Sequence, residues 1–272
     1  MITTLKQQID NHSGSETEKY NHLRELLQLL ILKKIDESGY FQKIAFVGGT
    51  ALRIVYDLKR FSEDLDFSLT NSVNFNFQSF IEKLAQELQY ESLVIEYKTK
   101  TTPAVCSAQL KFKNILFETN LSTHKDAIIM IKIEIDCNPP EGYITELSLI
   151  TKGDLINIHH FDLPSLFAGK LHALLHRKYT KGRDYYDFLW YCGRNVKPNL
   201  SMLHHALAQT GEITQNIDYS VLKKLLATYF EKADYEVVKK DLEMFLTDPK
   251  ELRLLTKDTF LNALQKLHWE AL

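Results

Sequence analysis

The sequence predicts an α+β fold in which a mixed sheet with flanking helices is followed by a C-terminal helical bundle. Residues 92–150 are rich in alternating, β-branched segments separated by polar or proline-containing breaks. From Pro164 onwards nearly every segment has helical periodicity instead. Strands and helices that are segregated along a chain are typical of α+β proteins. We therefore expect a first domain at residues 1–160 and a second, helical domain at residues 161–272.

The elements expected before the strand-rich region alternate between helix and strand. Each shows its own signal: leucines at helical spacing that end near Gly39, a short apolar run, or polar and apolar residues in alternation. They are a helix over 22–38, a strand over 43–47, a helix over 51–58, a strand over 61–69 and a helix over 77–89. In the second domain, Pro164 suits the first turn of a helix over 163–178. We expect a further helix over 183–192 and three or four more within 201–268.

Composition limits the classes of protein to consider. The formal net charge is −2, so the chain has no global positive field for nucleic acid, although residues 164–200 carry seven basic and two acidic residues. Three cysteines without CxxC spacing fit reduced thiols better than a disulfide framework. The N-terminus lacks a signal-peptide layout, and the longest apolar run, Leu26 to Leu32, is broken by Gln28 and too short for a bilayer. We expect a cytoplasmic protein without a membrane segment.

Two aspartates in the strand over 61–69 are the first candidate site residues. Asp64 and Asp66 are two residues apart and would lie on the same face of that strand. Like charges held so close repel each other unless a cation neutralises them, and Mg²⁺ prefers such oxygen ligands. Upstream, Gly48, Gly49 and Thr50 follow a strand and open a helix, where backbone N–H groups can approach a phosphate. Alone, either feature is more often a solvated strand face or an ordinary turn; their combination is far more specific.

The segment FVGGTALRIVYDLKRFSEDLDFSL, residues 46–69, resembles the AbiEii/AbiGii toxin family, which belongs to the DNA polymerase β-like nucleotidyltransferase superfamily. The match is strongest in RFSEDLDFSL. The resemblance implies a nucleotidyltransferase-type sheet and a magnesium site, with two metal ions expected. It also implies a nucleoside triphosphate (NTP) as substrate and a third metal-binding acid on a later strand.

The third acid is expected within IMIKIEIDC, residues 129–137. Alternation puts three isoleucines on the core face and three charged residues, Lys132, Glu134 and Asp136, on the other. The resemblance to the family's lysine-x-glutamate strand favours Glu134. Asp136 lies on the same face and is the candidate third acid in place of Glu134 if the strand register differs from the one expected. The alternative interpretation is a charged, solvent-exposed face of an edge strand.

A second group of candidates lies in the helical domain. Lys170, Leu174 and Arg177 share one helix face, with Lys170 and Arg177 about 10 Å apart along the axis. Asp184 and Asp187 are three residues apart at the start of the next helix, where helix capping and surface charge are the alternative explanation.

The pattern KLHALLHRKYTKGRDYYDFLW, residues 170–190, resembles the family's lysine, arginine and RD-x-x-D motif. The resemblance implies that Lys170 binds nucleotide phosphates and that Asp184 is needed for activity. Arg177, Arg183 and Asp187 become candidates for substrate binding. We therefore expect the helical domain to complete the active site.

The expected reaction is transfer of a nucleoside monophosphate from an NTP to an acceptor. The resemblance implies the 3′ end of transfer RNA as acceptor and a cognate antitoxin as partner. A protein or a small molecule remains open as the acceptor. A hypothesis of a different class is a catalytically silent protein that acts by binding its antitoxin, although such a binder has no need of paired carboxylates.

Overall fold

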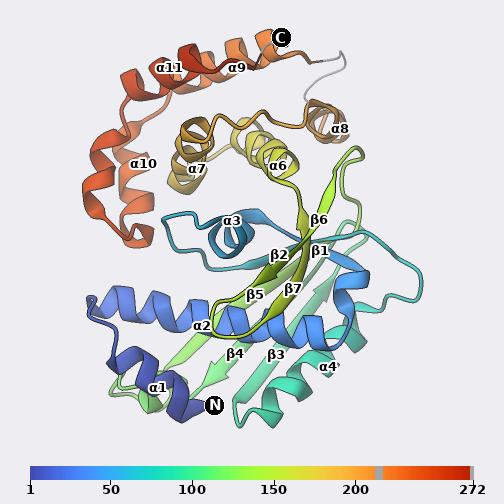
Figure 1. Ribbon diagram of the computed structural model, residues 1–272, viewed down its shortest axis with the longest axis vertical. Helices are drawn as coiled ribbons and strands as arrows, with labels where there is room; N and C mark the ends of the chain where they lie inside the picture. The colour runs from blue at the N-terminus through green and yellow to red at the C-terminus, as the bar shows by residue number, and fades with distance from the viewer. Residues whose placement is uncertain (212–216, 270–272) are drawn as a thin grey trace. The chain divides into compact units, whose positions relative to one another are not determined.

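The computed structural model of the chain describes residues 1–211 and 217–269, and the chain divides into two compact units (Figure 1). Unit 1 comprises Met1–Asp57, Phe61–Pro139 and Glu146–His160. Unit 2 comprises Leu58–Arg60, Pro140–Thr145 and Phe161–Leu272. The mixed sheet with helices around it, followed by a helical region, confirms the predicted fold class.

A seven-stranded mixed sheet, in the order β3-β4-β5-β2-β1-β7-β6, forms the centre of unit 1. Strands β3, β4 and β5 are antiparallel neighbours, β2 lies parallel to β5, and β1 lies antiparallel to β2 and parallel to β7. The bounds are β1 Ile44–Val47, β2 Leu65–Leu69, β3 Val94–Thr101, β4 Val105–Lys113, β5 Ile128–Asp136, β6 Thr145–Ile150 and β7 Ile156–Phe161. The central position of β1, β2 and β5 brings residues far apart in sequence to one part of the sheet.

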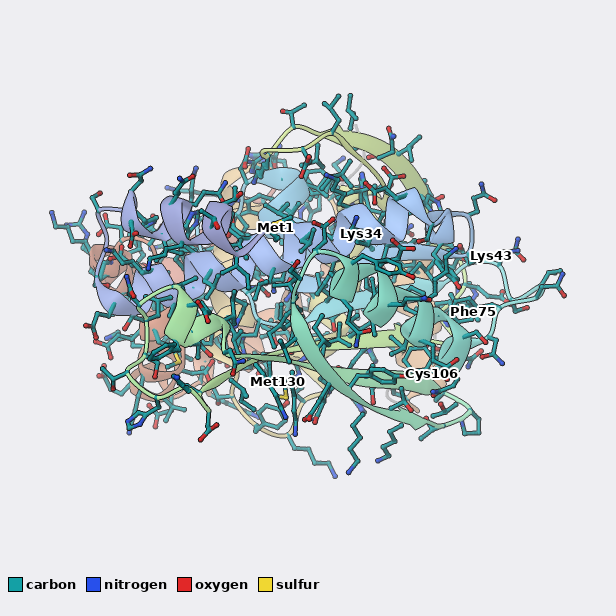
Figure 2. All side chains as sticks on the ribbon, turned by 90° about the horizontal axis from the view of Figure 1, so that it is seen from below. Met1, Lys34, Lys43, Phe75, Cys106 and Met130 are labelled. Carbon is teal, nitrogen blue, oxygen red and sulfur yellow. The ribbon has the colours of Figure 1, made fainter. Side chains whose placement is uncertain are left out.

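Helices cover one face of this sheet. They are α1 (Ile2–Asp10), α2 (Glu16–Glu37), α3 (Gly48–Tyr56), α4 (Phe77–Tyr90) and the short α5 (Ile115–Glu118). A capping box, in which Ser15 and Glu18 bond each other's backbone N–H, fixes the start of α2. Alternate residues of β4 and β5, such as Leu110 and Ile133, are buried beneath α2 and α4. Figure 2 shows these helices on one side of the strands.

Unit 2 is mainly helical, as predicted. Its helices are α6 (Leu163–His176), α7 (Gly182–Gly193), α8 (Leu200–Gln209), α9 (Tyr219–Glu231), α10 (Tyr235–Leu242) and α11 (Lys257–Lys266), with 3₁₀ turns at Glu243–Phe245 and Pro249–Leu254. Pro164 lies in the first turn of α6, and the side chain of Asp162 caps that helix. The core is aromatic: Phe167 stacks on Tyr191 with ring centroids 4.0 Å apart. None of the helices in the described part of the chain has the length and apolarity needed to span a bilayer.

Several element boundaries differ from the sequence prediction, and two of them concern candidate site residues. Strand β2 begins at Leu65, so Asp64 lies just before the strand and not inside it. Helix α6 ends at His176, so Arg177 does not share a helix face with Lys170. Arg177 has extended backbone angles, φ −67° and ψ 134°, and its N–H bonds the carbonyl of Ala173. Sequence periodicity does not locate the start of β2 or the end of α6, because local backbone interactions decide where a strand begins and a helix ends.

Candidate active site

The register between β2 and β5 places two of the predicted acids side by side. Asp66 is the direct partner of Glu134 in this parallel pair, so both side chains lie on the same face of neighbouring strands, about 4.8 Å apart at the backbone. Asp136 is opposite Ser68, further along the strands. Asp64 is two residues before Asp66, just ahead of β2, and both aspartates lie within electrostatic range of Lys132 on β5. Asp64, Asp66 and Glu134 are called the acidic cluster below. The register thus favours Glu134 over Asp136 as the neighbour of the aspartate pair.

Lys132 lies among these acids and balances part of their charge. Its Nζ is 2.7 Å from Oε1 of Glu134. Burial opposes the charged form of Lys132, but the hydrogen bond to Glu134 and the nearby carboxylates outweigh it and raise the lysine pKa. The contributing carboxylates include Asp64 and Asp66, which places both within electrostatic reach of the ammonium group. The lysine of the lysine-x-glutamate strand is therefore part of the acidic cluster.

Gly48 begins α3 at a position where a side chain cannot fit. Its φ of +78° lies in the left-handed region, which disfavours residues with a Cβ. A Cβ built there would also collide with the carboxylate of Asp66 and would lie 3.0 Å from its Cβ. The backbone at the start of α3 is therefore packed directly against an acid of the cluster. The N–H groups of the first turn of a helix lack intrahelical partners and can bind an anion.

Thr50 connects α3 to the segment that leads into β2. The residue is fully buried, and its hydroxyl donates a hydrogen bond to the backbone carbonyl of Asp64. A hydroxyl has a single proton to donate, so in this structure that proton is not available to a phosphate. Gly49 is also buried, in the first turn of the helix. The GGT segment thus contacts both aspartates: Gly48 packs against the side chain of Asp66, and Thr50 binds the backbone of Asp64.

A residue that the sequence analysis treated only as an interruption also holds this region. Gln28, in the middle of α2, is 1% exposed. Its Nε2 donates to the carbonyls of Ser62 at 3.1 Å and of Glu63 at 2.8 Å. Arg24, one turn earlier, forms an ion pair with Glu63 at 3.4 Å. The signal that could have found Gln28 is its place inside the apolar run of α2, since a buried amide needs partners.

The acids supply oxygen donors suitable for Mg²⁺ but do not form a complete metal cage by themselves. Within residues 1–211 and 217–269, no group of three or more His, Cys, Asp or Glu side chains has the arrangement of a metal site. Glu134 is engaged by Lys132 instead. Burial raises the pKa of Asp136, although the backbone N–H of Asn138 donates to this carboxylate and partly offsets the effect.

The family-motif residues of unit 2 form a buried network of ion pairs. Nζ of Lys170 lies 3.2 Å from Asp184 and 2.8 Å from Asp187. Asp187 also accepts two hydrogen bonds from Arg60, at 2.7 and 2.6 Å. Both side chains of this second pair are almost completely buried, at 0% and 1% exposure. Burial works against the charge of Asp187, yet Arg60 and Lys170 outweigh it and lower the carboxyl pKa.

The basic residues after α6 have different surroundings. Arg177 forms an ion pair with Asp184, and its side chain is 28% exposed. The guanidinium of Arg183 lies over the ring of Phe245, 4.1 Å from its centroid. Burial, followed by the charges of Arg183 and Arg177, lowers the pKa of Lys181. Arg183 and Arg177 thus lie close enough to Lys181 to repel its charge, and Asp184 offsets part of that repulsion.

A family model described as the nucleotidyl transferase AbiEii toxin of a type IV toxin–antitoxin system matches residues 30–271. The chain belongs to this family. The match confirms the resemblance inferred from residues 46–69 and extends it through the helical unit. An AbiEii-family toxin implies a cognate antitoxin as partner.

Solved structures show the same fold as this AbiEii-family chain. The crystal structure of JHP933 from Helicobacter pylori has a TM-score of 0.53 and 19% sequence identity, covering 91% of this chain and 93% of that one. A second H. pylori crystal structure, of a protein assigned as a nucleotidyltransferase, has the same TM-score and identity, covering 90% and 94%. At this identity the likeness concerns the fold alone. No curated protein sequence matches the chain significantly.

Arg60 is the residue of the AbiEii-family network that the sequence analysis missed. It is the first residue of the RFSEDLDFSL segment and belongs to unit 2, where it pairs with Asp187. The two residues are 127 positions apart, so no local spacing connects them. Asp187, in turn, is too buried to be a surface or capping charge.

Proposed function

We propose that this AbiEii-family nucleotidyltransferase transfers a nucleoside monophosphate from an NTP to the 3′ end of transfer RNA, with Mg²⁺ as cofactor. The observation that supports the proposal most directly is the pairing of Asp66 with Glu134 on neighbouring strands, beside the glycine that opens α3. Carboxylates at that position, next to a helix N-terminus, suit a triphosphate bound through a divalent cation.

In this reaction the oxygen of an acceptor hydroxyl attacks the α-phosphorus of the NTP. A new P–O bond forms to the acceptor, the bond between the α-phosphorus and the bridging oxygen breaks, and pyrophosphate leaves. The hydroxyl proton passes to a base. Glu134 is our candidate for activating the acceptor or binding a second metal ion, with Asp64 and Asp66 as ligands of the first.

Bound Mg²⁺ supplies positive charge that neutralises the phosphates and the developing charge of the transition state. It typically takes one or two carboxylates plus substrate phosphates, so a site with few protein ligands is completed by the nucleotide. Acids that supply only part of a coordination shell can therefore still act as Mg²⁺ ligands once the nucleotide is bound. Lys132, which pairs with Glu134, would have to release this carboxylate if Glu134 bound a cation.

Lys170 keeps a donor for substrate in spite of its two carboxylate partners. A lysine ammonium has three N–H donors, and Asp184 and Asp187 account for two. We propose that the third binds a phosphate oxygen and that Asp184 orients the ammonium. Asp187 then positions Lys170, while Arg60 neutralises that buried aspartate. Arg177 and Arg183 remain candidates for substrate contact.

The experiment is to incubate the full-length protein with each α-labelled NTP, total RNA and a protein extract, with Mg²⁺ or with EDTA. We expect label in the transfer-RNA band only with Mg²⁺. Asp66→Asn and Glu134→Gln should each abolish labelling, whereas Asp154→Asn, at an exposed acid paired with Lys33, should not. Label in the protein fraction or in a small molecule would contradict the proposed acceptor.

Growth assays separate the enzyme from a catalytically silent antitoxin-binding protein. Expression of the wild type should arrest growth, and the double variant Asp64→Ala with Asp66→Ala should not. Arrest that persists in a folded double variant would mean that the protein acts by binding.

A further inference from the structure

The face of the sheet opposite α2 and α4 is mainly polar along β3, β4 and β5, with a few exposed apolar residues such as Val94 and Met130. Residues that point the other way, such as Ile95, Leu110 and Ile133, are buried. Residues with the opposite parity are exposed or half-buried. Figure 2, in which Met130 marks β5, shows long side chains pointing from these strands away from the helices. The charged members of this face are Glu96, Lys98, Lys100, Lys111, Lys113, Lys132, Glu134 and Asp136.

Strand register connects this face to the acidic cluster in a continuous row. Lys100 on β3 is opposite Ser107 on β4, and Ser107 is opposite Glu134 on β5. Glu134 is in turn opposite Asp66 on β2. Three strand-to-strand steps separate Lys100 from Asp66, a backbone distance of about 14 Å. A neighbouring row contains Lys98, Gln109 and Lys132.

The charge changes sign along these rows. On β3 and β4 this face has four lysines and a single acid, Glu96, whereas β5 and β2 carry the acidic cluster. Lys113 is paired with Glu96. In the described part of the chain, Lys98, Lys100 and Lys111 make no ion pair, and Lys98 and Lys100 are exposed. Among the described residues, these three lysines without an ion pair thus share one face of the sheet with the acidic cluster, in a chain whose net charge is −2.

We propose that Lys98, Lys100 and Lys111, the β3–β4 lysines, bind the phosphate backbone of the single-stranded end of the acceptor and lead it toward Asp66 and Glu134. The inference rests on the proposed nucleotidyl transfer and adds the surface on which the acceptor lies. Lys98 and Lys100 are about 6.6 Å apart along the strand, close to the separation of successive phosphates in an extended single strand. Lysines act as point charges on phosphates without reading bases, which suits an acceptor recognised at its terminus.

Binding is tested without catalysis. Fluorescence anisotropy with a labelled single-stranded RNA, without NTP, compares the wild type with the triple variant Lys98→Gln, Lys100→Gln, Lys111→Gln over a range of salt. Three lost phosphate contacts reduce the slope of log affinity against log salt by about 2, and affinity at 0.1 M salt by about 100-fold. The matched control changes three exposed lysines of unit 2 that form no ion pair in the described residues, Lys224, Lys240 and Lys257, to Gln. It should retain the wild-type slope.

A transfer assay separates this inference from the function on which it rests. In the triple variant KM for the RNA should rise, with KM for the NTP unchanged. If the wild type labels RNA and the triple variant has the same KM and salt slope, the lysines only protect the edge strand β3 from pairing, and the inference is overturned. If polyglutamate competes as well as RNA and loses affinity equally in the variant, an acidic protein is the better partner and the inference also fails. A wild type that labels no RNA refutes the proposed function instead, whatever the binding result.

Discussion

The ion pair between Arg60 and Asp187 offers a sharp test of the buried network in unit 2. Asp187→Asn keeps the shape of the side chain but removes its charge. The guanidinium of Arg60, at 1% exposure, then loses two charge-assisted hydrogen bonds, and Lys170 loses its closer partner. Arg60 cannot lose its proton to escape this cost.

Removing one partner of a buried pair costs about 3–5 kcal/mol, because an uncompensated charge remains in the interior. That is a large fraction of a typical domain stability of about 5–15 kcal/mol. Replacing both members with apolar residues, as in Arg60→Met with Asp187→Leu, should restore most of the loss, since the desolvation cost of both charges disappears. The single variant should therefore be less stable than the double variant.

Urea unfolding followed by circular dichroism measures the effect, and its pH dependence identifies the cause. The pKa of Asp187 is lowered below its ordinary value of 3.8, so its contribution is complete above that pH and is lost as the pH falls through the lower folded-state value. The difference between wild type and Asp187→Asn should thus be constant near neutrality and shrink in acid. Glu236→Gln, at an exposed pair with Lys239, is the control and should change nothing measurable. A loss below about 1 kcal/mol for Asp187→Asn, or a double variant no better than the single one, would refute the reasoning.

Three further predictions concern unit 1. Gly48→Ala should destabilise the protein by at least about 1–2 kcal/mol from the left-handed backbone alone, and should abolish nucleotidyl transfer because its Cβ displaces Asp66; a variant with wild-type melting and activity would contradict this. Gln28→Leu leaves two half-buried backbone carbonyls without their donor, so we expect a loss of about 1–3 kcal/mol in thermal melts, with a further drop in kcat because the segment before Asp64 loses its support; unchanged kcat would argue against a positioning role. Asp136→Asn should raise the urea midpoint at neutral pH, because burial raises the pKa of this carboxyl and the folded state binds the proton more tightly; the gain should vanish as the pH falls below 3.8, and a lower midpoint at neutral pH would count against it.

The local sequence was enough to predict most elements and the residues of the acidic cluster. Alternation in residues 129–137 put Lys132, Glu134 and Asp136 on one face, and the structure confirms this burial pattern. It could not decide between Glu134 and Asp136, because that choice depends on the register with β2, a pairing across more than sixty residues of sequence. Strand β7, which was not predicted, has adjacent histidines that hide its periodicity, and the buried His160 bonds Ser148 there.

What the sequence determined by itself was therefore a set of candidate side chains: paired aspartates, a glycine turn, a third acid on a later strand and a basic helical motif of the AbiEii type. Spacing within a strand or helix fixes which side chains share a face, and that is local information. Only the tertiary structure decided which faces meet. It pairs Asp187 with Arg60, and it places Thr50 and Gln28 where they donate hydrogen bonds to the backbone of Asp64 and of Glu63. These partners are distant in sequence, and burial away from water is what makes each polar group require them.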